Sequence, residues 1–347
     1  AIKRGEGRVE IPKLRKTDTE GTELTGGYII RIDTYNEDDA TFPSKVPGIG
    51  EGIMTSQITW SCIYPKKKNL QPEQLAYIQQ SIDETEQAIQ SDDFADPQRG
   101  YAKYIDVPSF VDYFIHTELS LNADGFKRSA YFYKERQNAD GTGGKLFAGP
   151  VWDYNLAYGN CNFCNANKID AWCFEGGNTQ PTPALWQRLL QDPAFRKAVK
   201  TRYQSLRKTV LSDKAINTYI DNHAKLVAAA KERHFKEYPE LLVDESQKNN
   251  KEQQNAGMPN GFGGFPMMPG GFGGMGGGDA ISWFAAYRVS TYEEEIKTLK
   301  QWLADRLSFL DQNIDRFDKD FEPHIQKPVE IKPQNGGGFP FFQFPNM

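Results

Sequence analysis

Residues 104–160 limit what this chain can fold into more than any other stretch, because they combine a long apolar period with two acidic turns. At the start of the stretch, apolar side chains recur every three or four residues, at Phe110, Val111, Phe114, Ile115 and Leu119. This spacing predicts an amphipathic helix, and Asp106 shortly before Pro108 is a typical helix start. We therefore expect this helix to lie in the core and the segments after it to be displayed.

A β-hairpin flanked by two aspartates is predicted after this helix. Turn formers without periodicity predict loops, and alternating aromatic residues predict a strand. In order, we expect a loop at 122–125, a strand at 129–135, a turn at 137–144 and a second strand at 145–152. Asp124 therefore precedes the hairpin and Asp153 follows it, so the two loops can face one cavity.

Two carboxylates on either side of a hairpin are typical of phosphoryl-transfer enzymes of the protein-kinase type. In such enzymes one aspartate orients the acceptor hydroxyl and takes its proton, and the other holds Mg²⁺ on the nucleotide phosphates. The metal requires a hard oxygen ligand, and the hydroxyl requires a positioned proton acceptor. The alternative is that Asp124 and Asp153 are ordinary caps or solvated turn residues, which is the commoner role of aspartate in loops.

The sequence around both aspartates resembles the CotH family of atypical kinases of the spore coat. The resemblance rests on LFAGPVWDYNLAYGN at 146–160, ELSLNADG before it, the YFYKE strand, GGYIIRID at 26–33 and WLADRLSFLDQNI at 302–314, and it extends from residue 7 to residue 318. It implies an α+β, protein-kinase-like fold with a small β-rich amino-terminal part and a larger, mostly helical carboxy-terminal lobe. It also implies that ATP and Mg²⁺ bind, with Asp124 as the catalytic aspartate and Asp153 as the metal ligand.

The chain departs from the family pattern at three positions near these aspartates. Asn155 stands where many members have a second turn aspartate, Ser129 stands where kinases place a second metal ligand, and Val151 replaces a proline. An amide oxygen can still bind a metal but brings no charge. We therefore expect Asp153 and Asn155 to form a weakened metal site, which leaves open a weakened or substrate-assisted kinase, or a pseudokinase.

The strand GGYIIRID resembles the hinge strand of the family, which borders the adenine of the nucleotide. Asp33 is therefore a candidate nucleotide-binding residue, with Arg31 where many relatives are acidic. The alternative is that Arg31 and Asp33 form a plain surface pair. Kinase-like proteins carry a phosphate-binding lysine and a glycine-rich loop before the hinge, and neither is recognisable in residues 1–25. Either the amino-terminal lobe has been cut away, or the nucleotide site is incomplete.

Composition narrows the class of partner. A net charge of −5 and a pI near 5.6 give no support for nucleic-acid binding, and no apolar run is long enough to span a membrane. For the cysteine cluster Cys161, Cys164 and Cys173 we expect a disulfide first, free thiols second and a metal third. A disulfide would imply export, as does the family resemblance, so we expect an extracellular or cell-surface protein whose signal segment is absent from this sequence.

The remaining elements follow from local patterns. We expect strands at 7–14, 26–35 and 52–63, a loop at 35–50, helices at 72–90, 183–190, 192–211, 212–238 and 290–317, and a Gly/Met/Phe-rich loop at 255–278. The last helix is expected to open with the capping box Ser290-x-x-Glu293. Arg306 on this helix is expected to be a surface residue, the alternative being that it pairs with a core carboxylate. The expected division is a β-rich part at 1–63, a kinase-like lobe at 64–320 and an extended tail at 321–347.

The leading hypothesis is a CotH-like kinase that moves the γ-phosphoryl group of ATP to a Ser or Thr of a surface or secreted protein. Trp152 and Tyr154 are expected to lock the acidic turn rather than to touch substrate. The alternative is a catalytically inactive kinase-like protein that acts in coat assembly or adhesion. A serine hydrolase is not supported, because the sequence has no GxSxG turn. The acceptor protein and the oligomeric state do not follow from the sequence.

Overall fold

One antiparallel sheet joins the candidate hairpin to strands from the beginning of the chain. The computed structural model describes residues 12–49, 57–161, 165–175, 182–238 and 291–315. Within them the strands are β1 (Tyr28–Ile32), β2 (Ala40–Ile49), β3 (Gln57–Tyr64), β4 (Ala130–Lys134), β5 (Leu146–Ala148) and β6 (Thr182–Pro183). Their order across the sheet is β5-β4-β1-β3-β2-β6. The hairpin β4–β5 is therefore one edge of this sheet, and β1 pairs directly with it.

Strand β1 brings the predicted hinge strand alongside the hairpin. Its register with β4 sets Arg31 opposite Tyr131 and Ile32 opposite Ala130. Alternate β1 residues are buried, as expected for a strand with one face on the core. The end of β1 therefore lies beside the start of β4, close to the predicted acidic loop.

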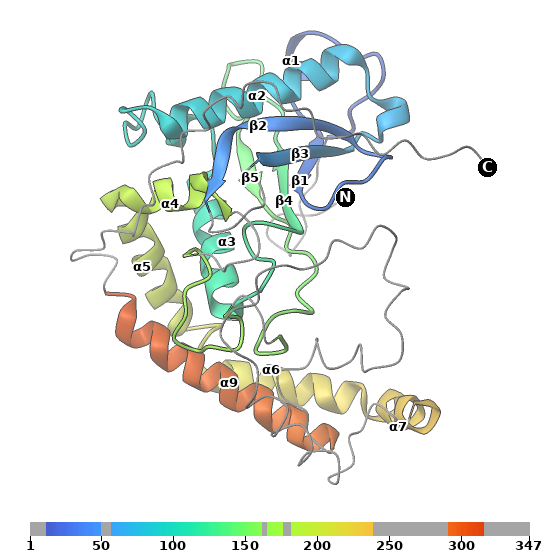
Figure 1. Cartoon of the computed structure of the whole chain (residues 1–347), viewed down its shortest axis with the longest axis vertical. Helices are drawn as coiled ribbons and strands as arrows, with labels where there is room; N and C mark the ends of the chain where they lie inside the picture. The colour runs from blue at the N-terminus through green and yellow to red at the C-terminus, as the bar shows by residue number, and fades with distance from the viewer. Residues whose placement is uncertain (1–11, 50–56, 162–164, 176–181, 239–290, 316–347) are drawn as a thin grey trace, which may run out of the picture.

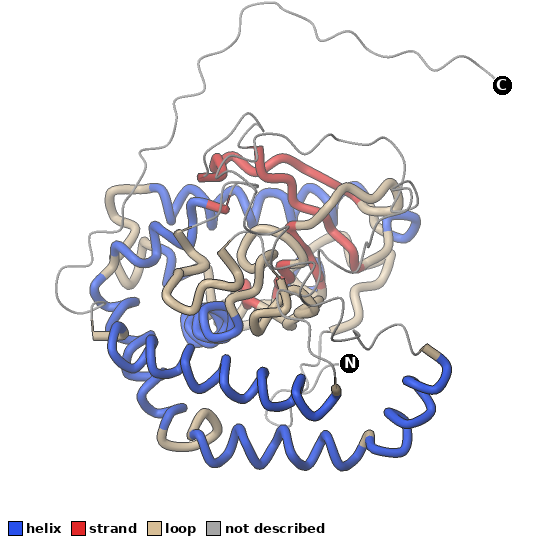
Figure 2. The backbone as a smooth tube through the Cα atoms, turned by 60° about the horizontal axis from the view of Figure 1, so that its bottom comes forward, coloured by secondary structure: helices blue, strands red, loops and turns tan. Residues whose placement is uncertain are grey.

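Helices surround the sheet and build the other half of the molecule. The described helices are α1 (Gly21–Leu24), α2 (Pro72–Gln90), α3 (Val107–Ser120), α4 (Ala184–Gln191), α5 (Pro193–Arg207), α6 (Asp213–Leu226), α7 (Ala228–Glu237) and α9 (Tyr292–Asn313), with short 3₁₀ turns at Lys67–Asn69 and Tyr101–Lys103. Figure 1 shows α2 along the sheet, α3 running away from it, and α6 and α9 at the opposite end. Figure 2 shows the strands gathered on one side and these helices framing the other. These observations confirm the predicted α+β class.

Helix α3 is the core helix that the apolar period predicts. Asp106 caps it, with its carboxylate accepting a hydrogen bond from Ser109 N at 2.9 Å. Its aromatic face packs on the sheet and on α4, with the Phe110 ring 5.9 Å from that of Phe132 and 5.5 Å from that of Trp186. Because α3 is held on both sides, the segment that leaves its C-terminal end is held as well.

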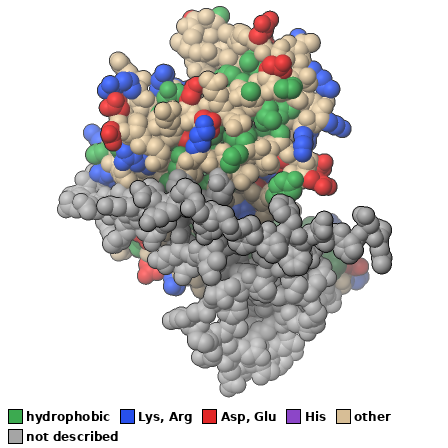
Figure 3. All heavy atoms as spheres, turned by 45° about the horizontal axis from the view of Figure 1, so that its top comes forward, with side chains coloured by type: hydrophobic (Ala, Val, Ile, Leu, Met, Phe, Trp, Pro, Cys, Tyr) green, Lys and Arg blue, Asp and Glu red, His purple; other side chains and the backbone are tan. Residues whose placement is uncertain are grey.

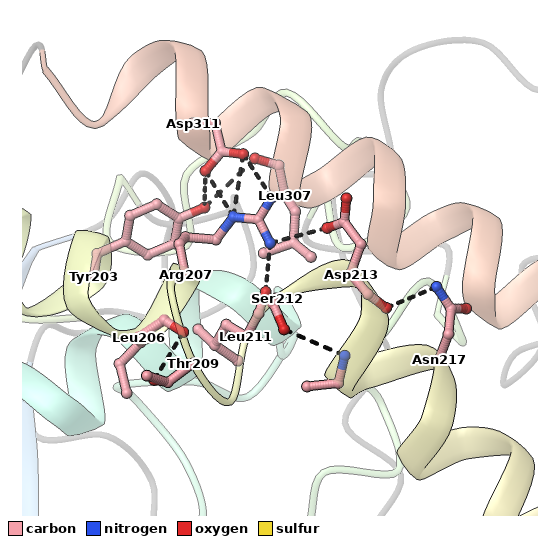
Figure 4. Close-up of polar contacts among 11 residues, drawn as sticks. Tyr203, Leu206, Arg207, Thr209, Leu211, Ser212, Asp213, Asn217, Leu307 and Asp311 are labelled. Atoms are coloured by element: carbon pink, nitrogen blue, oxygen red, sulfur yellow. Dashed lines mark hydrogen bonds and ion pairs between the residues drawn. The ribbon is translucent and has the colours of Figure 1, made fainter.

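Helix α9 closes the helical half through a polar network on α5 (Figure 4). Arg207 Nη2 lies 2.9 Å from Asp311 Oδ2 on α9, and its Nη1 lies 2.9 Å from Asp213 Oδ1 on α6. The Tyr203 hydroxyl donates to the same Asp311 carboxylate at 2.8 Å. An exposed ion pair alone contributes little, but this set joins three helices at one point.

The prediction of a loop over residues 35–50 is wrong, because Ala40–Ile49 form strand β2. Thr41, Pro43 and Lys45 are exposed while Phe42, Ser44 and Val46 are buried. This alternation is that of a strand, and the prolines and charged residues obscured it. Proline is tolerated because the β2–β3 register shifts between Pro43 and Pro47, where the regular ladder is interrupted.

Several predicted boundaries also need correction. The second hairpin strand ends at Ala148 rather than Trp152, and the helix predicted at 212–238 is two helices that part at Val227. Helix α9 is capped by Thr291, whose hydroxyl accepts from Glu294 N at 3.1 Å, not by Ser290. The expected strand at 7–14 is described only from residue 12, and 12–14 are not in a strand. The segments 255–278 and 321–347 lie outside the described residues, and the domain division remains a prediction.

Charges of both signs are interspersed on the face in Figure 3, over the part of the chain that the structure describes. This mixture agrees with a net charge of only −5. None of the described helices combines the length and the apolar character that a bilayer crossing requires. On this face the charges therefore do not gather into a patch of one sign.

Candidate functional site

Asp124 lies in a tight turn at the C-terminal end of α3. The helix ends at Leu121, which has the left-handed φ of 47°, and the turn closes with Arg128 N donating to Asp124 O at 2.9 Å. A side chain at Gly125 would meet Thr117 Cγ2 at 2.3 Å and Asn122 O at 2.9 Å. Only glycine therefore lets the turn lie this close to the helix that positions it.

Asp153 lies in the turn after β5, exposed, with a φ of 60°. The residue after it anchors the turn to α3. The Tyr154 hydroxyl lies 3.3 Å from Thr117 Oγ1, and its ring meets the edge of His116 at 4.6 Å between centroids. A left-handed non-glycine residue is energetically costly and is found where the surroundings enforce it, often at functional sites.

The two turns are hydrogen-bonded to a common frame. Ala123 N donates to Leu156 O at 3.1 Å, and Tyr158 N donates to Ser120 O at 2.7 Å. The chain just after Asp153 is therefore tied to the helix end and to the residue just before Asp124. In the described residues every non-glycine position with positive φ except Asn165 lies between Leu121 and Tyr158.

The pKa of the Asp124 carboxyl is influenced by other acidic residues of the site. Burial is the largest influence and raises the pKa of the Asp124 carboxyl. The charges of Arg128 and Lys127 lower this pKa, and those of Asp153 and Asp33 raise it further. The fold thus brings the charges of Asp153 and Asp33 close enough to Asp124 to act on its pKa, although the three residues are distant in sequence.

Asp33 forms an ion pair with Arg31, as in the alternative that the sequence left open, but the pair is not a plain surface pair. Both side chains are mostly covered, with Arg31 Nη1 3.0 Å from Asp33 Oδ2. The same guanidinium reaches Asp39 Oδ2 at 2.8 Å and donates to the Tyr131 hydroxyl at 3.0 Å. Arg31 thus neutralises two aspartates and leaves Asp33 fixed at the edge of the acidic region.

Asn155 and Ser129, the two departures from the family pattern, lie in different surroundings. Asn155 is exposed in the same turn as Asp153. Ser129 is buried at the start of β4 with a left-handed φ of 49°. Kinases carry asparagine at this position, and asparagine adopts the left-handed backbone region more readily than most residues. The conformation of Ser129 therefore suits asparagine better than serine.

Comparison with known families assigns the chain to one of them. A sequence model of the family described as CotH kinase protein matches residues 15–310, which is most of the chain. The chain belongs to the CotH family. None of the curated proteins compared with it matches significantly. CotH membership confirms the resemblance drawn from the sequence and agrees with the observed fold, a small antiparallel sheet followed by a mostly helical part.

The predicted role of Tyr154 in locking the CotH turn agrees with its contacts on α3, whereas that of Trp152 remains a prediction. Trp152 is 59 % exposed and Val151 before it is 49 % exposed. The Trp152 ring leans on Tyr131 with 5.9 Å between centroids. Tyr154 holds the turn against α3. Trp152 is left as an exposed aromatic side chain next to Asp153, with its ring on Tyr131 of β4.

Two cations of the CotH site were missed in the sequence, Lys127 and Arg128. Both follow Asp124 closely, and both act on its pKa. Their spacing from Asp124 was the available signal, but nothing in the residue types distinguished them from solvated charges of a turn. The burial that makes Lys127 unusual depends on tertiary packing.

The cysteines of the CotH chain do not form the disulfide expected within 161–173 among the described residues. Cys161 and Cys173 carry thiols. The Cys161 side chain packs with Ala123 and Leu156, and Cys173 Sγ donates to Asn122 O at 3.2 Å. The two thiols therefore occupy separate surroundings under the Asp124 turn. Cys164 lies outside the described residues.

Proposed function

We propose that this CotH protein is a kinase that transfers the γ-phosphoryl group of ATP to a serine or threonine of a protein acceptor, with Mg²⁺. The observation that carries the proposal is electrostatic. Asp124 is half-buried, and its pKa is raised by burial and by the charges of Asp153 and Asp33. A concentration of carboxylates on one region of the fold is costly in the free protein, and a bound cation relieves it.

In this proposal Asp124 is the catalytic residue that orients the acceptor hydroxyl and receives its proton. A carboxylate with a raised pKa is a better proton acceptor than an ordinary exposed aspartate. Its tight turn restricts the direction in which the carboxylate can point, which favours positioning of the hydroxyl. The proton would reside on an Asp124 carboxylate oxygen while the acceptor oxygen attacks phosphorus.

Asp153 and Asn155 would hold the metal. No three His, Cys, Asp or Glu side chains of the described chain gather into a metal-binding group. Mg²⁺ does not require such a cage, because it is commonly held by one or two carboxylates together with phosphates and water. An exposed carboxylate and a neighbouring amide fit that donor set, and bound Mg²⁺ would neutralise charge on the transferred phosphoryl group.

The nucleotide would lie along the end of β1, with Asp33 at its border and its base against the exposed ring of Trp152. Arg31 lies 5.8 Å above the Tyr131 ring, so Tyr131 and Trp152 are fixed beside each other. A purine presents a flat π face to such a surface, and stacking on an aromatic side chain contributes about 1–3 kcal/mol. The acceptor protein would be a surface or secreted protein, since the CotH family is associated with the spore coat.

Incorporation of label from [γ-³²P]ATP into the full chain or added protein tests the proposal. We expect incorporation that needs Mg²⁺ and falls about 10²- to 10⁴-fold in Asp124→Asn. Asp153→Ala should abolish it. Asp305→Ala is the matched control, because it removes an exposed carboxylate of α9. Equal incorporation in the Asp153 and Asp305 variants would reject the assignment.

A catalytically inactive CotH scaffold is the second candidate, and Asn155 favours it. Its amide brings no charge to the turn where a second carboxylate would strengthen metal binding. In this case the full chain would incorporate no label and would show no thermal shift with ATP and Mg²⁺. A thermal shift without incorporation would instead indicate a nucleotide-binding pseudokinase.

A further inference from the structure

Lys127 is a buried cation without a counterion in the described part of the chain. Its side chain belongs to the turn of Asp124 and only 8 % of the residue is exposed. Lysine is seldom buried to this degree unless it is paired. The other deeply buried lysine of the described residues, Lys134, is satisfied, because its ammonium donates to the carbonyl oxygens of Thr25 and Gly144.

The ammonium of Lys127 has no such partners. Only its backbone N–H is engaged, which donates to Asp124 O at 3.2 Å. Among the described residues, Lys127 Nζ makes no ion pair and no side-chain hydrogen bond. It is also not one of the fully buried polar atoms that lack a hydrogen-bond partner. It follows that Nζ keeps some contact with solvent. Lys127 therefore has a covered stem and an ammonium that is not fully buried, which a ligand can reach.

The nearby acidic groups do not pair with the Lys127 ammonium. Its charge lowers the pKa of Asp124, but no salt bridge joins the two side chains. Arg128 is also near Asp124, is half-buried, and takes part in no ion pair among the described residues. Lys127 and Arg128, which are adjacent in sequence, thus have no ion-pair partner beside Asp124 among the described residues. Arg31 on β1, in contrast, is paired with Asp33 and Asp39.

We propose that Lys127, with Arg128 at its side, forms an oxyanion site that binds a phosphoryl group next to Asp124. A compact ammonium supplies hydrogen bonds to tetrahedral oxygens, and a guanidinium adds a second donor set. The inference deepens the proposed function and rests on it for the identity of the transferred group. The oxyanion is the phosphate of a nucleotide or the phosphate of a phosphorylated acceptor, since both present the same oxygens to the two cations.

Three variants of the full chain test the site. Lys127→Met keeps the length of the stem and removes the charge, whereas Lys127→Arg keeps the charge. Lys66→Met is the control, because Lys66 is an exposed lysine outside the turn. The probes are inorganic phosphate, ATP without Mg²⁺, and a phosphoserine peptide, each titrated while thermal unfolding is followed. Measurement without Mg²⁺ keeps the readout independent of catalysis and of the metal site.

We expect inorganic phosphate to raise the melting temperature of the wild type, of Lys127→Arg and of Lys66→Met. In Lys127→Met the apparent affinity should fall about 10- to 100-fold, the loss expected for one charge-assisted hydrogen bond. Without any anion, Lys127→Met should melt higher than the wild type, because methionine keeps the covered stem and removes an ammonium that has no counterion among the described residues. A purely structural lysine would give the opposite change.

The probes also identify the source of the oxyanion. Tighter Lys127-dependent binding of ATP than of the phosphopeptide assigns the site to the nucleotide, and the reverse order assigns it to the acceptor. The proposal is overturned if Lys127→Met responds to phosphate as the wild type does, or if it melts lower without anion. Phosphate binding that depends on Lys127 in a chain without kinase activity would support the site while rejecting phosphoryl transfer.

Discussion

Asp124 titrates under four neighbouring charges of both signs. Lys127 and Arg128 favour its ionised form, and Asp33 and Asp153 oppose it, with burial opposing it most strongly. Its pKa is therefore set jointly by the turn, by β1 and by the turn after β5. This balance makes the protonation of Asp124 a sensitive measure of whether these segments meet as described.

Replacing Asp33 by asparagine should lower the pKa of Asp124. The change removes a negative charge that disfavours ionisation of Asp124, so the carboxylate forms at lower pH. If the kinase proposal holds, the acidic limb of the pH–rate profile shifts to lower pH in the same direction. The pKa can be followed by NMR of the Asp124 carboxyl carbon without reference to activity.

Asp38→Asn is the control for this measurement, because Asp38 is an exposed carboxylate of the same loop and is not among the charges that act on Asp124. An unchanged or raised pKa in Asp33→Asn would show that Asp33 lies too far from Asp124 to influence it.

Trp152 should report nucleotide binding by fluorescence. The other tryptophans of the described residues, Trp60, Trp172, Trp186 and Trp302, are buried, so acrylamide should quench Trp152 preferentially among them. We expect ATP to protect this component by covering the ring, and Trp152→Phe to remove the protected component. Inorganic phosphate is the control, because it has no base to stack. Equal protection by phosphate and ATP would contradict the stacking proposal.

At the scale of elements, α3 organises the candidate site. Its C-terminal end carries the Asp124 turn, and its His116, Thr117 and Ser120 contact the turn that carries Asp153. One helix thus sets the positions of two loops that are separated by a whole hairpin. Small changes at the contact between α3 and either loop should therefore disturb both aspartates.

Gly125→Ala should displace the Asp124 turn from α3. The added methyl group would lie 2.3 Å from Thr117 Cγ2, and a β-branched helical side chain has little freedom to move away. We expect a stability loss of about 1–3 kcal/mol, the usual range for overpacking, and a larger proportional loss of activity than of stability. Urea unfolding and the labelling assay measure the two effects.

Gly141→Ala is the control for steric contact, because a side chain at Gly141 in the hairpin turn meets nothing within 4 Å. Its φ of 84° adds a backbone strain that Gly125 does not have, so its stability loss is measured alongside. A Gly125 variant that loses no more activity than the Gly141 variant would show that the close approach to α3 is unimportant for the site.

At the scale of the whole molecule, a buried ion pair joins the site to the last described helix. Arg306 of α9 is fully buried and donates to Glu118 O on α3 from Nε at 3.0 Å. This is the pairing with a core residue that the sequence left open as the alternative to a surface position. The Glu118 carboxylate also accepts from Cys173 N and Phe174 N, each at 2.8 Å. Removal of either charge would leave its partner buried and uncompensated.

Stability should therefore depend on pH through Glu118. Burial raises the pKa of Glu118 to about 7, against the lowering influence of Arg306 and of the two backbone N–H groups. Because the folded value exceeds the unfolded value, this stabilising contribution is complete below about pH 4.5. It is lost as the pH rises through 7, at no more than about 1.4 kcal/mol per pH unit.

Glu118→Gln should remove this dependence and lower stability at every pH, since its amide group cannot accept both backbone hydrogen bonds. Urea unfolding between pH 5 and pH 8 measures the slope. Glu84→Gln, which alters an exposed carboxylate of α2, should keep the wild-type slope. A Glu118 variant with the same slope as the wild type would assign the pH dependence to other groups.

The parts of the fold that the sequence predicted are those governed by local periodicity. Helix α2 lies at the predicted residues 72–90, α3 falls within the predicted helix, and β1 and β4 lie inside the predicted strands. Strand β2 was missed because it contains prolines and charged residues. Its alternation of buried and exposed side chains arises only when α2 and the core cover one face of the strand. Likewise, Asp124 and Asp153 were identifiable from their loops, but the influence of the Asp153 charge on the pKa of Asp124 was not.

By itself, the sequence determined that α2, α3 and the hairpin form, where the two acidic turns lie, and the resemblance to the CotH family, because backbone preferences and side-chain period act over a few neighbouring residues. Only the tertiary structure decided which charges are buried. In the sequence, Lys127 looks like an ordinary surface cation, Arg306 fits a surface position or a pairing with a core carboxylate, and Trp152 is expected to lock the acidic turn. Their exposure depends on segments more than a hundred residues away or on the hydrogen bonds between two loops, and no local pattern encodes those contacts.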